Sequence, residues 1–236
     1  MGVKVAGSIP GIHHVTCITG DVQKCVDFYV NVLGLRFIKK SINQDMPDTY
    51  HIYFGDYLGT PGTAMTFFGW PTWPKQRAGS GQVTTVAFQV PEGSLGFWSN
   101  RLKQFEVDHR MVSRFDSEAL ALRDVDGIEL ELVAKASDDR WMPWQDGPVD
   151  EKHAIRGFHS VTMTLAEVAA TFNLLTSVMG FRVSSEDGKR TRFETGSGGP
   201  HSIVDVIEAP EGPEGEESLG SVHHVAWRTT DATSQK

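Results

Sequence analysis

A short motif recurs along this chain, and the recurrence constrains the fold more than any other feature of the sequence. Residues 11–16 read Gly-Ile-His-His-Val-Thr, and residues 157–162 read Gly-Phe-His-Ser-Val-Thr. Residues 221–226 repeat the pattern as Ser-Val-His-His-Val-Ala, and residues 84–88 form a fainter copy, Thr-Thr-Val-Ala-Phe. Self-similarity of this kind indicates one supersecondary unit that is used several times, here four.

Each copy of the motif opens a unit in which a strand is followed by a helix and further strands. In the first unit, β-branched residues at 15–18 indicate a strand. Asp21 can cap a helix, apolar residues at helical spacing fill 22–33, and Gly34 suits the helix C-terminus. Two further strands, separated by a glycine-rich turn, are expected at 50–54 and 64–68. The pattern predicts an α+β fold of repeated βαβββ modules.

The repeat divides the chain into four modules, which we expect to pair into cup-shaped half-barrels. Their expected limits are 1–80, 81–150, 151–219 and 220–236. The fourth module has room only for its first strand and, after Asp231, the first turn of a helix. We therefore expect a truncated module that continues past Lys236 in the complete protein, with a naturally short family member as the alternative.

The composition excludes several classes of partner. There are 22 Lys and Arg residues against 30 Asp and Glu, for a net charge of −8, and no basic cluster suits nucleic acid. No apolar run approaches the roughly 20 residues that span a bilayer, and no signal peptide is recognisable. Cys17 and Cys25 suit free thiols in a reducing compartment. We expect a cytoplasmic protein that binds neither nucleic acid nor membranes and could form a homo-oligomer.

Two histidine pairs, His13-His14 and His223-His224, stand at equivalent positions of the first and fourth units. Neighbours in a strand point to opposite faces, so one histidine of each pair can face a cavity while the other packs behind or beside it. A single pair would carry little information, but recurrence at matching positions favours a shared site. Two imidazoles with one carboxylate are typical of Fe(II) sites that leave positions open for substrate and O₂.

The sequence offers two placements for the carboxylate. Glu131, in the closing strand of the second unit, could approach His14 if the first and second units share one cup. Alternatively, the matching position of the fourth unit falls at about residue 270, outside these 236 residues. In the second case we expect this chain to bind iron weakly and to have little or no activity, because two imidazoles alone must hold the ion.

Longer segments around these motifs match one group of enzymes. They are 11–16 with 19–21, 50–56, 59–68, 156–160 and 222–224. The segments resemble the ring-cleaving dioxygenases of the vicinal-oxygen-chelate superfamily, specifically its hydroquinone and chlorohydroquinone dioxygenases. The similarity extends from Gly11 to Asp231.

The resemblance implies a site and a reaction. His14 and His224 would bind Fe(II), whereas His13, His223 and Thr16 would surround the substrate and assist catalysis. The family's third ligand, a glutamate in the closing strand of the last unit, has no counterpart in this sequence. The implied enzyme is a non-haem iron, extradiol-type dioxygenase that opens a small aromatic ring of the hydroquinone class with O₂.

Other functions stay open on the same scaffold. A glyoxalase-like isomerase or lyase would use Zn²⁺ or Ni²⁺ to polarise a carbonyl, and a metal-free binding module would need no ligands. His51 lies in an aromatic-rich strand and is expected to be packed or hydrogen-bonded rather than a ligand. Trp70 and Trp73 are expected to cover the hydrophobic core.

Overall fold

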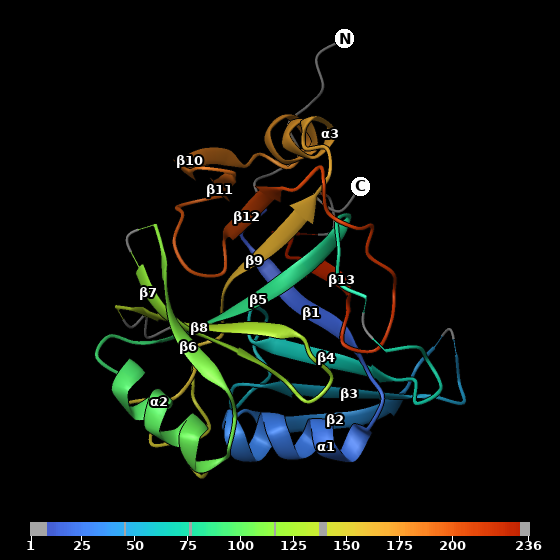
Figure 1. The fold of residues 1–236 in the computed structure, drawn as a ribbon. Coiled ribbons are helices and arrows are strands. Elements are labelled where there is room, and N and C mark those ends of the chain that lie inside the picture. The colour runs from blue at the N-terminus through green and yellow to red at the C-terminus, as the bar shows by residue number, and fades with distance from the viewer. Residues whose placement is uncertain (1–8, 45, 76, 116, 137–140, 232–236) are drawn as a thin grey trace.

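The computed structural model describes residues 9–44, 46–75, 77–115, 117–136 and 141–231. Its elements run strand, helix and three strands in three successive segments, followed by one more strand (Figure 1). The first segment contains β1 (Ile12–Thr19), α1 (Val22–Asp27), the π-helical turn η1 (Phe28–Val32), β2 (Arg36–Ile42), β3 (Tyr50–Gly55) and β4 (Ala64–Gly69). The second contains β5 (Gln82–Pro91), α2 (Leu95–Gln104), β6 (His109–Arg114), β7 (Ser117–Arg123) and β8 (Glu129–Lys135). The remaining elements are β9 (Phe158–Leu165), α3 (Ala169–Asn173), the π-helical turn η2 (Leu174–Val178), β10 (Arg182–Asp187), β11 (Arg190–Glu194), β12 (Ile203–Glu208) and β13 (Val222–Trp227).

This order of elements confirms the predicted α+β class. The limits of the four modules stay a prediction. The helical turn expected after Asp231 falls on residues 232–236, outside the described residues. Within the described ranges, no helix is both long and apolar enough to cross a bilayer.

Strand pairing joins the units in two pairs. The five-stranded sheet has the order β13-β1-β4-β3-β2, and the eight-stranded sheet has the order β10-β11-β12-β9-β5-β8-β7-β6. Because β1 runs antiparallel to β13 and β5 antiparallel to β9, the first unit pairs with the start of the fourth, and the second pairs with the third. The alternative in which the first and second units share one cup is therefore wrong.

The first helix begins and ends where its capping residues predict. Asp21 Oδ1 accepts the backbone N–H of Lys24 at 3.1 Å, and Gly34 takes a φ of 71° just after the helical segment. Between them, the Tyr29 ring packs 4.8 Å from the Phe67 ring of β4, measured between centroids. These contacts fix the helical segment on one face of the five-stranded sheet.

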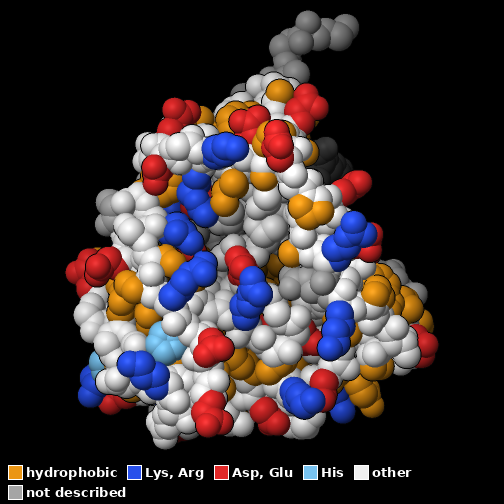
Figure 2. Space-filling view, viewed as in Figure 1, with side chains coloured by type: hydrophobic (Ala, Val, Ile, Leu, Met, Phe, Trp, Pro, Cys, Tyr) orange, Lys and Arg blue, Asp and Glu red, His pale blue; other side chains and the backbone are white. Residues whose placement is uncertain are grey.

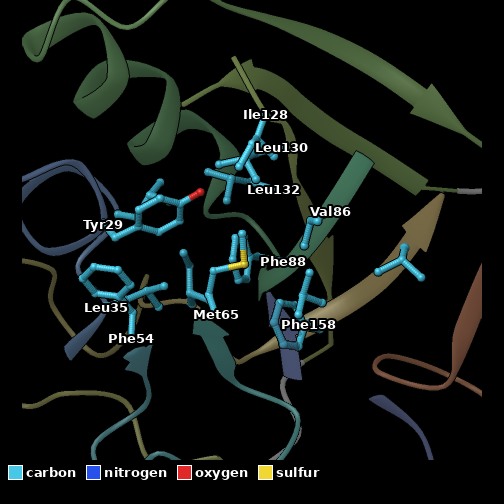
Figure 3. Close-up of a cluster of buried hydrophobic side chains, with 14 of the residues drawn as sticks. Tyr29, Leu35, Phe54, Met65, Val86, Phe88, Ile128, Leu130, Leu132 and Phe158 are labelled. Atoms are coloured by element: carbon cyan, nitrogen blue, oxygen red, sulfur yellow. The ribbon is translucent and has the colours of Figure 1, made fainter. Parts of the chain in front are cut away.

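Alternation along the strands separates the hydrophobic core from the opposite face of the sheet. Val15 and Cys17 on β1 are fully buried in the core, which spans both sheets through Met65 of β4 and Phe88 of β5 (Figure 3). Cys17 and Cys25 are both free and buried. The residues that alternate with Val15 and Cys17 along β1 point away from this core. That second face of β1 carries the candidate site.

Candidate active site

His14 on β1 and His224 on β13 meet where the first unit pairs with the fourth. The two strands are antiparallel with Thr16 opposite His224, and the Nε2 atoms of His14 and His224 lie 3.1 Å apart. Two nitrogens bound to one ion at about 2.0–2.1 Å, at a right angle to one another, would be separated by about 3 Å. The predicted convergence of these two imidazoles is confirmed.

The first histidine of each pair contacts the second in the same way. His13 Nδ1 lies 2.9 Å from His14 Nδ1, and His223 Nδ1 lies 2.8 Å from His224 Nδ1. The outer rings of His13 and His223 are exposed, whereas the inner rings are half-buried. When an inner ring donates its Nδ1 hydrogen to the outer ring, its Nε2 keeps a lone pair that faces the other inner ring. The outer histidines are thus placed to set the tautomer that metal binding requires.

A chain of hydrogen bonds leads from His224 across the five-stranded sheet. Thr16 Oγ1 lies 3.0 Å from His224 Nε2 and 2.7 Å from Thr66 Oγ1. Thr66 Oγ1 lies 3.0 Å from His51 Nε2, and the Tyr53 hydroxyl lies 2.8 Å from His51 Nδ1. Three strands of the first unit therefore contribute polar groups to the site.

His51 and Tyr53 are site residues that sequence reasoning missed. The structure shows the hydrogen-bonded histidine that was expected at position 51, but its bonds lead into the site. A signal was present in the sequence, because residues two apart in a strand share a face. On β3, His51 stands opposite Phe68 and Tyr53 stands opposite Thr66, the residue that bonds to Thr16.

Burial favours the neutral form of four histidines at the site. Burial is the main cause that lowers the pKa of His14 to about 4 and that of His51 to about 4, and neighbouring positive charge lowers both further. The pKa of His224 and that of His13 are also lowered, again mainly by burial. Neutral imidazole is the form that coordinates metal ions, so the environment favours ligation at neutral pH.

An aromatic wall stands beside His223. The Phe68 ring stacks on Trp70 with centroids 5.3 Å apart, Trp73 lies 4.3 Å from Trp70, and Phe68 meets His223 edge-on at 5.2 Å. Trp70 Nε1 is buried and has no hydrogen-bond partner among the described residues. The two tryptophans thus cover a small apolar cluster, as expected, and also border the site.

The described residues do not supply the third ligand. In those ranges, no group of three or more His, Cys, Asp or Glu side chains is arranged to hold a metal ion. Glu131 lies on β8 of the other sheet, where its carboxylate is 2.8 Å from the Arg114 guanidinium. Glu131 is therefore not a partner of His14, and a glutamate at about position 270 stays a prediction from the repeat.

The sequence also matches a known family model. Residues 11–132 match the model described as the Glyoxalase/Bleomycin resistance protein/Dioxygenase superfamily. The chain belongs to this superfamily. Membership confirms the resemblance drawn from the histidine pairs and the motifs around them, and it agrees with the curled sheets of the fold.

Named relatives of this superfamily member extend over most of its length. MhqO of Bacillus subtilis, named as a ring-cleaving dioxygenase, is 37% identical over 225 residues, which are 95% of this chain and 71% of MhqO. The chlorohydroquinone/hydroquinone 1,2-dioxygenase of Sphingobium indicum is 33% identical over 240 residues, covering 96% of this chain and 73% of that enzyme.

Solved structures show the same fold. A crystal structure of a Bacillus subtilis protein named as a dioxygenase superposes with a TM-score of 0.90 at 36% identity, covering 98% of this chain and 73% of that one. Glyoxalase I from Zea mays gives a TM-score of 0.68 at 14% identity, covering 95% and 76% of the two chains. The similarity to glyoxalase I, at this low identity, shows a shared fold only.

Proposed function

We propose that this superfamily member is a ring-cleaving dioxygenase that opens a hydroquinone-type aromatic ring with O₂ in the cytoplasm. The observation that carries the proposal is the 3.1 Å separation of His14 Nε2 and His224 Nε2, contributed by two units that are far apart in the sequence. The names of relatives at 33% to 37% identity support the same chemistry.

The two inner imidazoles suit a divalent cation. If each inner ring donates its Nδ1 hydrogen to its outer neighbour, two Nε2 lone pairs face one another at 3.1 Å, and a cation between them would relieve their repulsion. His14 and His224 would hold Fe(II), with a carboxylate as the third ligand. When bound, Fe(II) would bring a deprotonated phenolic oxygen and O₂ to neighbouring positions.

The surrounding side chains have separate tasks. His13 and His223 would accept the Nδ1 hydrogens of the inner rings and so hold those rings in the ligating tautomer. The Nε2 of His223, which then carries a hydrogen, lies 3.4 Å from a carboxylate oxygen of Glu217, and this contact would hold the outer ring in place. The Thr16 hydroxyl, 3.0 Å from the same His224 Nε2, would lie beside the metal position, because an Nε2 lone pair that binds a cation no longer accepts a hydrogen bond.

The substrate class decides which bond is broken. The two hydroxyl groups of a hydroquinone are not on adjacent carbons, so cleavage beside a hydroxyl breaks the bond between a hydroxylated and an unsubstituted carbon. That is extradiol-type cleavage. The buried stack of Phe68 and Trp70 meets His223 edge-on and would give an apolar border to such an aromatic ring.

Metal binding and turnover test the proposal together. We expect at most weak O₂ consumption and ring opening of hydroquinone from these 236 residues in excess Fe(II), because the described residues supply only two ligands, and we expect His14→Ala and His224→Ala to abolish both iron retention and turnover. His109→Ala, which removes a histidine on β6 bonded to Ser99, serves as the matched control and should leave both unchanged. Activity that requires Zn²⁺ or Ni²⁺ and no O₂ would instead establish the glyoxalase-like alternative.

Iron stoichiometry is a second readout that needs no turnover. Because the described residues offer only two ligands, we expect less than one iron per chain after desalting. Full retention of iron that survives His14→Ala would show that other residues bind the metal, and the proposed ligand pair would be wrong.

A further inference from the structure

The second and third units form a concave face of their own on the eight-stranded sheet. Ala87 pairs with Glu131 across β5 and β8, and Thr162 pairs with Asp205 across β9 and β12. In the candidate active site, the equivalent position is that of Thr66, which pairs with Thr16 across β4 and β1. Both Glu131 and Asp205 are buried. We infer that this face binds a small molecule that carries a carboxylate on an apolar body, with Arg114 as its main contact.

The site differs in chemistry from the histidine site. Thr85 and Ser160 stand where the repeated motif places His14 in the first unit, so arginines rather than imidazoles surround the acids. The Arg114 guanidinium lies 2.8 Å from Glu131, and Arg192 forms a two-point contact with Asp205 at 2.7 and 2.9 Å.

A third arginine gives this cluster an excess of positive charge. Arg190 Nη1 lies 3.1 Å from Asp205 and 3.2 Å from Thr162 Oγ1, and its side chain is only 16% exposed. Arg192 lies 4.2 Å from the ring centre of Phe115, the neighbour of Arg114, so the described residues bring three guanidinium groups into one region with two carboxylates. An anionic ligand would restore neutrality without displacing either acid.

The cluster adjoins a cavity of about 620 Å³. Thr85, Arg114 and Glu131 line it, together with Ala121 and Phe28. The strand pairing places Thr85 opposite Thr162, whose hydroxyl accepts from Arg190, so the third arginine contacts the strand next to the cavity lining. Small and apolar side chains at the floor leave room for an apolar body.

Charged side chains of both signs surround this hollow. Figure 2 shows several Lys and Arg side chains around a depression near the centre of the face. The exposed pair Arg123–Glu129, at 2.7 Å, lines the cavity, as do the exposed acids Glu106 and Asp108. Asp124 and Arg110 complete the charged lining, in which five acids stand against three arginines, so selectivity for an anion rests on the buried cluster.

Arg114 is the residue best placed to meet the ligand. Its side chain is 26% exposed, and its Nε and Nη2 bind Glu131 while Nη1 donates to the Ser113 carbonyl. A guanidinium has five N–H groups, and these contacts engage three of them. Its planar shape suits two parallel hydrogen bonds to a carboxylate.

Benzoate is the probe for a titration by calorimetry, with benzyl alcohol and benzylamine as the neutral and cationic analogues. We expect benzoate to bind, and the two analogues to bind at least tenfold more weakly. Glu131→Gln removes the competing carboxylate while keeping its shape, and it should tighten benzoate binding several-fold. Arg114→Gln should weaken binding at least tenfold.

The two single variants should change the benzoate affinity in opposite directions. This makes the test decisive, because loss of folding cannot tighten binding. The double variant Arg114→Gln/Glu131→Gln leaves no buried charge unpaired and should bind as weakly as Arg114→Gln. Equal binding of benzoate and benzyl alcohol, or weaker binding in Glu131→Gln, would overturn the inference. His14→Ala must leave the benzoate affinity unchanged, and a loss there would assign the ligand to the histidine site. This result does not depend on whether the proposed dioxygenase activity is correct.

Discussion

Thr16 Oγ1 lies 3.0 Å from His224 Nε2, although 208 positions separate the two residues in the sequence. The contact exists because β1 pairs antiparallel with β13 and puts these two residues opposite one another. Thr16 is fully buried and also bonds to Thr66, so its hydroxyl is held in one place. A buried, doubly bonded hydroxyl beside a ligand-type nitrogen suits a positioning residue.

Thr16→Val should lower the remaining turnover of hydroquinone about tenfold to a hundredfold, because the variant keeps the shape of the side chain but loses the hydroxyl beside the ligand nitrogen of His224. Steady-state O₂ uptake in excess Fe(II) is the measurement. Thr84→Val is the matched control, because it removes a similar Thr–Thr hydrogen bond, 2.8 Å from Thr164, on the other sheet. Equal losses of turnover in Thr16→Val and Thr84→Val would mean that the Thr16 hydroxyl contributes to stability alone.

His13→Ala should weaken metal binding roughly tenfold to a hundredfold, since it removes the partner of His14 Nδ1 and leaves the tautomer of the inner ring undetermined. Titration with Co(II), followed by its visible absorption, measures this directly. His13→Asn offers an amide oxygen as the replacement acceptor and should recover part of the affinity. An unchanged Co(II) affinity in His13→Ala would show that the outer ring does not position the inner one.

Gly157→Ala should destabilise the protein by roughly 3 kcal/mol or more. Gly157 has a φ of 95°, and an added Cβ would lie 2.7 Å from the backbone oxygen of Gly62, which cannot move aside as a side chain can. Gly188→Ala is the control, because it shares a positive φ of 58° but meets nothing within 4 Å, so it should lose only about 1 kcal/mol. The free energies of unfolding in urea should therefore differ between the two variants, and equal values would contradict the steric argument.

Asp124 should make stability depend on pH. Burial is the main cause that raises the pKa of this carboxyl to about 7, although Tyr29 and the N–H of Ile128 donate to it. Because the folded pKa lies above the unfolded value near 3.8, the contribution is fully present below pH 3.8 and is lost as pH rises through 7. The loss is on the order of 4 kcal/mol across that window.

Asp124→Asn is the matched variant for this dependence, since an amide keeps an acceptor for the backbone and stays neutral at every pH. Urea unfolding at pH 5 and pH 8 should show a smaller change in the variant than in the unaltered protein. Parallel pH profiles for the two proteins would show that another group is responsible.

Much of the site was predictable from local sequence. Asp21 and Gly34 bound the first helix because capping depends only on residues a few positions away. The histidine pairs were recognisable because a repeated unit places equivalent residues at equivalent strand positions. Residues close together in sequence, and repeats of them, therefore determined the α+β class and the two histidine pairs, whereas the choice of His14 and His224 within the pairs came from the family resemblance.

The tertiary structure decided which units meet. Pairing of β1 with β13, and of β5 with β9, brought His14 to His224 and left Glu131 beside Arg114. Each unit exposes a similar strand edge, so local propensity cannot choose between partners, and the choice depends on burial of the core that spans both sheets. The same long-range pairing turned His51 into a member of the site, because its contact with Thr66 arises only once β3 and β4 are in register.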